Sequence, residues 1–129
     1  FFSVAHRPEV AKFHQSQLTI FGDGKQTRDF TYVKDVAEGL SRAADHPGAA
    51  GKVINLAGGN PVSVLDVIDT MEKVIGEKLP RSFAPPRPGE ILHSYADPAT
   101  LRECLDFVPG TPLEEGLKAT FEWFRSRER

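Results

Sequence analysis

Short apolar runs separated by polar turns predict several brief β-strands in this chain. Residues 18–21 and 53–56 are dominated by apolar side chains, and residues 81–83 predict a third strand. The run at 53–56 is of the kind that a parallel sheet buries on both faces. A turn over residues 22–24 leads to residues 28–33, where the sequence predicts a fourth strand because residues 31–33 are β-formers.

Apolar residues recur at helical spacing elsewhere in the chain. The helices that this periodicity predicts cover residues 35–45, 63–75, 97–105 and 111–125, and Pro8 stands where a further helix would begin. The side chains expected to cap these helices are Asp35, Ser63 with Asp66, and Thr111 with Glu114. The last helix is expected to bury Leu113, Leu117, Phe121 and Phe124. Four to five helices among short strands indicate the α/β class.

Composition and charge narrow the class of protein. The 129 residues suit one domain or part of a larger one, and the first residue, Phe1, predicts a piece of a longer polypeptide. The net charge is −2 with both signs well mixed, so we expect no nucleic-acid partner. No apolar run approaches the ~20 residues of a membrane span, and we expect neither a membrane nor a signal peptide. The single Cys104 excludes an internal disulfide and indicates a reducing, cytoplasmic compartment.

Few clusters of residues point to chemistry. The four histidines lack ligand spacing, so the sequence predicts no metal site. Gly22 and Gly24 lack the third glycine of a dinucleotide fingerprint, because a threonine takes its place, and a strand is expected to follow them instead of a helix. No cofactor-binding residue is therefore predicted. Cys104, Trp123 and Phe124 are expected to pack inside the fold.

Arg28 stands out because it follows a glycine turn and precedes an acid. A guanidinium held in such a place presents a planar fork that matches the geometry of a phosphate. The alternative is a surface arginine paired with Asp29, Asp35 or Glu90, which would contribute about 0–1 kcal/mol to stability. The residues by themselves leave both interpretations open.

The segment 21–36 reads FGDGKQTRDFTYVKDV, and it resembles the Gly-x-Gly-x-Gln-x-Arg-Asp-Phe-x-Tyr-Val-x-Asp-Val segment of the extended short-chain dehydrogenase/reductases. These proteins are the NAD-dependent nucleotide-sugar epimerases and dehydratases. The segments Pro-Arg-Pro-Gly-Glu at 86–90, Tyr-Ala-Asp at 95–97 and Leu-Glu-Glu-Gly at 113–116 resemble the UDP-hexose and UDP-hexuronate 4-epimerases among them. The resemblance implies that residues 1–129 form the C-terminal, substrate-binding portion of a Rossmann-type enzyme, without a complete dinucleotide-binding domain.

The resemblance also implies a binding site. Arg28 and Arg87 would bracket the diphosphate of a UDP- or dTDP-sugar, and Glu90 would accept from a ribose hydroxyl or orient Arg87. Phe21 takes the family's base-packing position, with packing in the core as the alternative. The family's catalytic Tyr-x-x-x-Lys pair is absent, since neither tyrosine has a lysine four residues later, and we expect no catalytic residue in this chain.

For the parent protein the resemblance implies an NAD-dependent UDP-hexose 4-epimerase, which oxidises a sugar C4 hydroxyl and then reduces it from the other face. The chain alone is expected to be inactive and to bind no NAD. Residues 32–58 are expected to pack on the missing N-terminal cofactor domain and to extend its sheet. The exposed strand edge then predicts a homodimer or self-association. The alternatives are a non-catalytic nucleotide-sugar-binding module and a dimerisation module.

Overall fold

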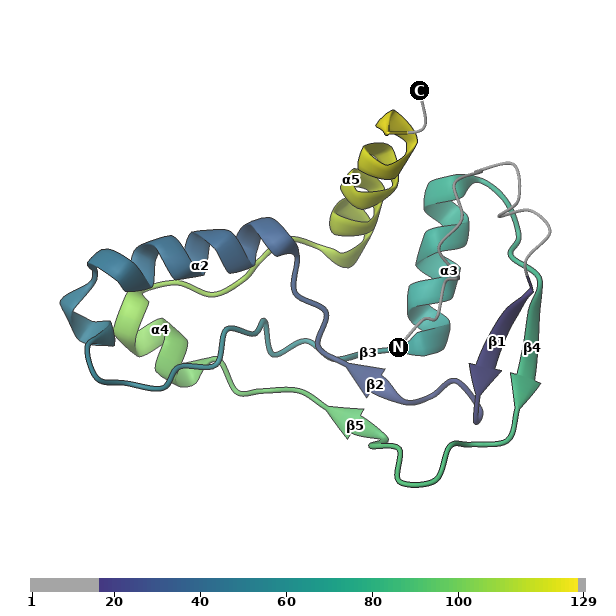
Figure 1. Ribbon diagram of the computed structural model, residues 1–129, viewed down its shortest axis with the longest axis horizontal. Helices are drawn as coiled ribbons and strands as arrows, with labels where there is room; N and C mark the ends of the chain where they lie inside the picture. Colours follow the sequence, from purple (N-terminus) through teal and green to yellow (C-terminus); the bar gives the residue numbers. More distant parts are fainter. Residues whose placement is uncertain (1–16, 128–129) are drawn as a thin grey trace.

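The computed structural model describes residues 17–127, which form an elongated α/β molecule. Figure 1 shows helices α2 (Val33–Asp45) and α4 (Ala99–Leu105) at one end, and strands β1 (Leu18–Phe21) and β4 (Arg81–Ala84) at the other. A small sheet lies between the two ends. The helices of this described part of the chain are too short or too polar to cross a bilayer.

Strands β1 and β4 form a parallel pair, and their register places Phe21 opposite Ala84. The strands expected over 18–21 and 81–83 are thereby confirmed. Parallel neighbours need a crossover connection, and here that connection contains helix α3 (Val64–Ile75). The helix expected near Pro8 lies outside the described residues.

The central sheet consists of three two-residue strands. Strand β2 (Thr27–Arg28) lies between β3 (Val62–Ser63), which runs antiparallel to it, and β5 (His93–Ser94), which runs parallel. The strand expected over 28–33 is confirmed only at Arg28, because β2 covers Thr27–Arg28 and the chain has left the sheet before residues 31–33. A β-forming residue makes a strand where a ladder partner is available, and propensity alone does not supply one.

Helix α2 begins earlier than its expected cap. Asp35 lies inside the helix, and the N-cap residue is Tyr32, whose side chain makes no capping bond. Asp35 instead accepts from the Thr111 hydroxyl at 2.7 Å and from the Thr111 N–H at 2.9 Å. Helix α5 (Leu113–Ser126) accordingly begins after Pro112, also without a side-chain cap. Both expected caps are wrong for one reason: the Thr111 hydroxyl donates to the Asp35 carboxylate, so neither side chain caps the helix that follows it.

Helix α5 packs against α3 and leaves its last turn largely exposed. Leu113, Leu117 and Phe121 are half-buried, which agrees with the prediction. Phe124 is 58% exposed, so the burial expected for it is wrong, and Trp123 beside it is 49% exposed. The two rings meet edge to face, with their centroids 4.9 Å apart. Both are exposed because the described residues cover only one side of this helix.

Helix α3 has the capping box that the sequence predicts. The Ser63 hydroxyl accepts from the Asp66 N–H, and the Asp66 carboxylate accepts from the Ser63 N–H, each at 3.1 Å. Gly76 ends the helix in the left-handed conformation, with φ at 82°. Both ends of this helix are therefore set by local sequence.

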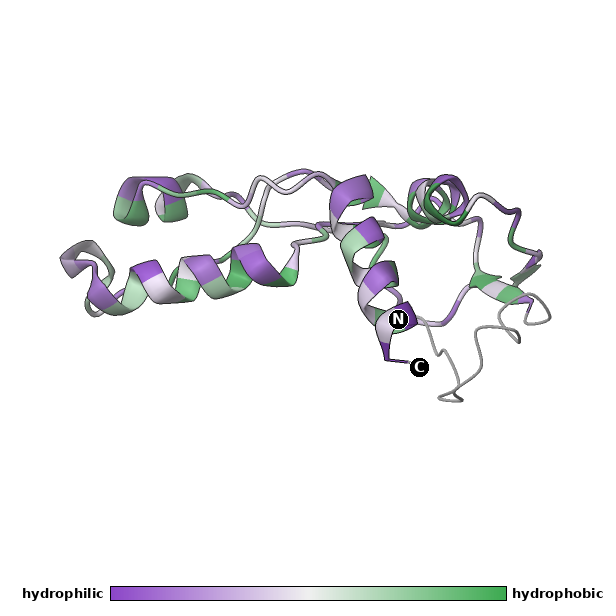
Figure 2. Cartoon of the chain, turned by 90° about the horizontal axis from the view of Figure 1, so that it is seen from above, coloured by the Kyte–Doolittle hydropathy of each residue, from purple (hydrophilic) through white to green (hydrophobic). Residues whose placement is uncertain are grey.

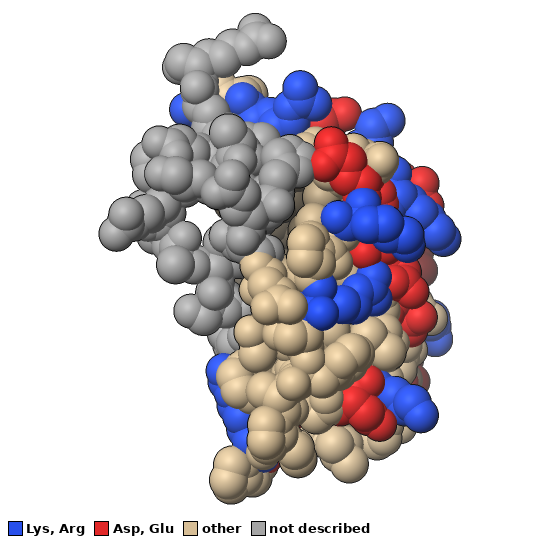
Figure 3. All heavy atoms as spheres, turned by 90° about the vertical axis from the view of Figure 1, so that its right-hand side faces the viewer, with Lys and Arg blue, Asp and Glu red and all other residues tan. Residues whose placement is uncertain are grey.

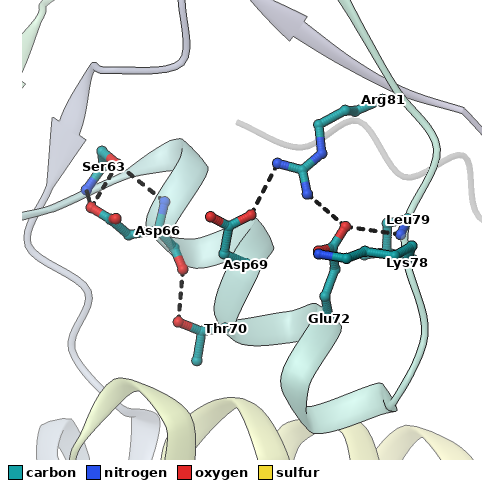
Figure 4. Close-up of polar contacts among 8 residues, drawn as sticks. All are labelled: Ser63, Asp66, Asp69, Thr70, Glu72, Lys78, Leu79 and Arg81. Atoms are coloured by element: carbon teal, nitrogen blue, oxygen red, sulfur yellow. Dashed lines mark hydrogen bonds and ion pairs between the residues drawn. The ribbon is translucent and has the colours of Figure 1, made fainter.

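A charged network joins the end of α3 to the start of β4. The buried Glu72 carboxylate accepts from Lys78 Nζ at 2.6 Å, from the Leu79 N–H at 3.0 Å and from Arg81 Nη2 at 2.5 Å (Figure 4). Arg81 also donates to Asp69 at 3.0 Å. These donors, led by Lys78, lower the pKa of Glu72 to about 2.

The main apolar core lies between α2, α4 and the short 3-10 helix η1 (Pro47–Ala49). Its buried residues are Leu101, Cys104 and Leu105, and the half-buried residues packed on them are Ala43, Ala49, Ile54, Leu56 and Phe107. The burial expected for Cys104 is confirmed.

Residues 53–56 run along this core as extended chain, not as a strand. Ile54 and Leu56 pack on the core, whereas Val53 is 96% exposed. No strand of the described part of the chain pairs with these residues, and a strand requires ladder partners, so the strand expected here stays a prediction about a sheet in another domain.

Candidate functional site

A wide hollow opens at the carboxyl ends of β1 and β4, and we call it the strand-end cleft. Its volume is about 660 Å³, which is in the range of ~300–1,000 Å³ that small-molecule sites occupy. Ligands of α/β proteins bind outside the carboxyl ends of parallel strands. Figure 3 shows the side of the molecule that carries β1 and β4, with basic and acidic side chains interleaved over part of it. The cleft is lined by residues that include Phe21, Gln26, Phe83, Arg87, Glu90 and Leu92.

Phe21 and Arg87 contact each other inside the strand-end cleft. Phe21 is the last residue of β1 and is half-buried, and the guanidinium carbon of Arg87 lies 3.9 Å from the centroid of its ring. The register of β1 and β4 brings the two together, because Arg87 follows Ala84, the partner of Phe21, by three positions. Among residues 17–127, Arg87 has no acidic partner, so its N–H donors are available.

Arg28 lies at the edge of the cleft and is held by backbone carbonyls. Its Nη1 donates to Thr27 O at 2.7 Å and to Leu92 O at 3.4 Å. Its Nη2 lies 3.9 Å from Glu90 Oε1, so the pairing that the sequence offered as an alternative role is present as a contact. The two side chains are 34% and 25% exposed, and such a long, partly hydrated ion pair contributes little to stability.

The predicted site residues therefore gather in one region. Phe21, Arg87 and Glu90 line the strand-end cleft, and Arg28 joins it through Glu90. Gln26 was not among the predicted residues: it is buried, and its Nε2 donates to Phe21 O at 2.9 Å. That bond fixes the backbone beneath the cleft. The signal that would have identified it is the glutamine of the Gly-x-Gly-x-Gln segment.

The glycine turn between β1 and β2 does not fit a dinucleotide cofactor. Gly22 and Gly24 have φ of 77° and 76°, and the turn leads into a strand, so no helix N-terminus faces a pyrophosphate. A Cβ on Gly24 would lie 2.7 Å from Leu65 Cγ, so this glycine allows α3 to approach the turn. The described residues thus form no NAD cradle at this turn, and no three of their potential metal ligands lie together.

A second, smaller cavity of about 180 Å³ lies where the segment after β2 meets the start of α5. Asp29 lines it with one oxygen satisfied and one not: Oδ2 accepts from the Gly59 N–H at 2.8 Å, whereas Oδ1 is buried without a hydrogen-bond partner. The sequence indicated Asp29 only as a possible partner of Arg28. A cavity of this size lies below the ~300 Å³ at which small-molecule sites begin, so the strand-end cleft is the better candidate for a nucleotide.

Comparison with known proteins gives a consistent result. The NAD dependent epimerase/dehydratase family model matches residues 5–57. UDP-glucuronate 4-epimerase of Thermodesulfobacterium geofontis is 35% identical over 127 residues, covering 92% of this chain and 39% of the relative. UDP-glucose 4-epimerase of Pasteurella multocida is 37% identical over 123 residues, covering 89% of this chain and 36% of the relative.

Solved structures of epimerases share the fold. Bacillus cereus UDP-glucuronic acid 4-epimerase, in complex with UDP-glucuronic acid and NAD, superposes with a TM-score of 0.79 at 37% identity, over 86% of this chain and 36% of that one. Thermotoga maritima UDP-glucose 4-epimerase with UDP-glucose superposes with a TM-score of 0.82 at 30% identity, over 92% of this chain and 38% of that one. The chain thus spans somewhat more than a third of the length of these relatives. In sequence and in fold, the chain is thus similar over most of its length to a part of these 4-epimerases, and its residues 5–57 match the NAD dependent epimerase/dehydratase family model.

Proposed function

We propose that this chain is the nucleotide-sugar-binding portion of an NAD-dependent 4-epimerase that acts on a UDP-hexose or UDP-hexuronate. The observation that carries the proposal is the strand-end cleft, in which Phe21, Arg87 and Glu90 meet at the carboxyl ends of two parallel strands. The 4-epimerase relatives, two of which are structures with UDP-sugars, support this choice of ligand over a dTDP-sugar.

The chemistry of the cleft suits a diphosphate. A guanidinium binds phosphate oxygens through pairs of N–H donors, and charge-assisted bonds of this kind are stronger than neutral ones. Arg87 has donors available, whereas Arg28 already donates to two carbonyls and approaches Glu90. We therefore assign the larger share of phosphate binding to Arg87. Glu90, 3.9 Å from Arg28, orients that arginine or accepts from a ribose hydroxyl.

The redox chemistry of the proposed reaction belongs to the rest of the parent protein. There, oxidation of the sugar C4 hydroxyl and its reduction from the other face would need NAD and a Tyr-x-x-x-Lys pair. This chain has no such pair, and its glycine turn does not fit the cofactor. Its own task in this proposal is to bind and orient the nucleotide sugar, and by itself it is inactive.

Residues 32–58 dock on the cofactor domain in this proposal. Figure 2 shows hydrophobic residues along α2, among which Val33 and Leu40 are 69% and 63% exposed. Val53, in the extended segment, is 96% exposed. These apolar side chains supply a surface that another domain would cover, and without that domain we expect the chain to self-associate.

We place the parent protein in the cytoplasm, because a free buried thiol such as Cys104 is stable in that reducing compartment.

Arginine variants test the proposal through the affinity for UDP-glucose, measured by isothermal titration. Arg87→Ala is expected to weaken binding ~10- to 100-fold, because it removes charge-assisted hydrogen bonds, and Arg28→Ala to weaken it less. Arg102→Ala, an exposed arginine on α4, is the matched control and leaves the affinity unchanged. If the arginine variants lose UDP-glucose binding but the parent protein has no epimerase activity, the non-catalytic binding module is favoured. A chain that self-associates but binds no UDP-sugar would favour the dimerisation module.

A further inference from the structure

We infer that Phe21 is a positioning residue for Arg87: its ring holds the guanidinium with the N–H donors directed to the diphosphate. This inference rests on the proposed function of the strand-end cleft. It assigns Phe21 a role through Arg87, in place of the base packing that the family resemblance implies for this position.

The contact between the two side chains has the geometry of a cation–π pair. The guanidinium carbon lies 3.9 Å from the ring centroid, which is van der Waals contact and well inside the ~6 Å limit for such pairs. A guanidinium that stacks by its face keeps its five N–H donors in its own plane. The ring can therefore fix the head of Arg87 while leaving its hydrogen-bonding capacity free for phosphate oxygens.

The ring stands on a rigid element, whereas the arginine does not. The backbone at Phe21 is fixed by Gln26 Nε2, which donates to its carbonyl at 2.9 Å, and by the Gly22 N–H, which donates to Ala84 O at 2.9 Å. Arg87 lies in a segment without regular structure, is exposed, and has no acidic partner among the described residues. Holding such a side chain in place before binding reduces the ordering cost when the ligand arrives.

The same contact argues against simple base packing. The face of the Phe21 ring that Arg87 covers is closed to a pyrimidine, so base packing there would require the arginine to leave. The two roles therefore predict different dependence on the phosphates of the ligand. A positioning role affects ligands that carry phosphates, and a packing role affects every ligand that carries the base.

The test compares UDP with uridine, which carries the base without phosphates, by titration of the chain followed by NMR. Phe21→Leu is expected to weaken UDP binding roughly 2- to 30-fold and to leave uridine binding unchanged. Phe21→Tyr, which keeps a ring, restores the UDP affinity. In an Arg87→Met background, Phe21→Leu has no further effect. Phe121→Leu removes a half-buried ring that lies 5.7 Å from Arg125 on α5, and it is the matched control for loss of stability.

An equal loss of affinity for UDP and uridine in Phe21→Leu would overturn the inference and return Phe21 to base packing. A wild-type chain that binds no UDP would overturn the proposed function itself, so the two failures are distinguishable. A second measurement needs no variant: the side-chain protons of Arg87 should carry a ring-current shift in the free chain and keep it with UDP bound. Disappearance of that shift on binding would contradict the positioning role.

Discussion

The Glu72 carboxylate is held between a lysine, an arginine and a backbone N–H at the junction of α3 and β4. Its pKa is about 2 in the folded chain, against an ordinary value of 4.5, with the Lys78 bond as the largest cause. The unfolded chain therefore binds this proton more tightly than the folded chain. The resulting contribution to stability is complete above pH 4.5 and is lost as the pH falls through about 2.

Replacing Glu72 by glutamine should expose this dependence. We expect Glu72→Gln to lower the free energy of unfolding at pH 7, because Lys78 and Arg81 lose their anionic partner. Urea unfolding at a series of pH values should show the difference from wild type shrinking between pH 4.5 and 2. Glu122→Gln, an exposed residue of α5, is the control and shows little effect. A difference that stays constant down to pH 2 would contradict the assignment.

At the scale of single elements, the Ser63 capping box is the clearest case of local sequence that stabilises a helix, here the start of α3. Ser63→Ala removes the acceptor of the Asp66 N–H and should lower the free energy of unfolding by ~0.5–2 kcal/mol. Thermal and urea unfolding measure the change. Ser41→Ala, at an exposed position within α2, is the matched substitution without a cap and should change stability by a few tenths of a kcal/mol at most. Equal effects of the two substitutions would show that the cap is unimportant.

Elements whose signals are local were predictable from the sequence. The capping box at Ser63 and the glycine stop at Gly76 involve residues a few positions apart, and both are confirmed. Where a partner lies far along the chain, prediction failed. Asp35 bonds Thr111, 76 positions away, so neither residue caps its own helix. Residues 53–56 have the composition of a strand but no partner in the described part of the chain.

The sequence predicted which residues gather at the candidate site, but it did not predict how they contact one another. The segments around Phe21, Arg28 and Arg87 identified the residues of the cleft because their order along the chain resembles the family's. The contact between Arg87 and Phe21 joins positions 66 apart and depends on the register of β1 with β4, which no local pattern encodes. The motif contains Gln26, but its bond to the Phe21 carbonyl could not be inferred from the motif, and Gln26 was therefore not predicted as a site residue.

At the scale of the whole molecule, exposed apolar side chains on α2 and the neighbouring extended segment predict self-association. Leu40→Lys combined with Val53→Lys should shift the chain toward monomer at high concentration, because both positions are largely exposed and apolar. Light scattering over a range of concentrations measures the change. Ile91→Lys, at a position 65% exposed and outside this surface, is the control. A wild-type chain that stays monomeric at every concentration would contradict this account.

The central claim is that this segment binds the nucleotide sugar and leaves the cofactor to the rest of the protein. The most direct measurement is a pair of calorimetric titrations of the chain, one with UDP-glucose and one with NAD. The account predicts saturable one-to-one binding of UDP-glucose that Arg87→Ala weakens, and no binding of NAD. Binding of NAD without binding of UDP-glucose would contradict it.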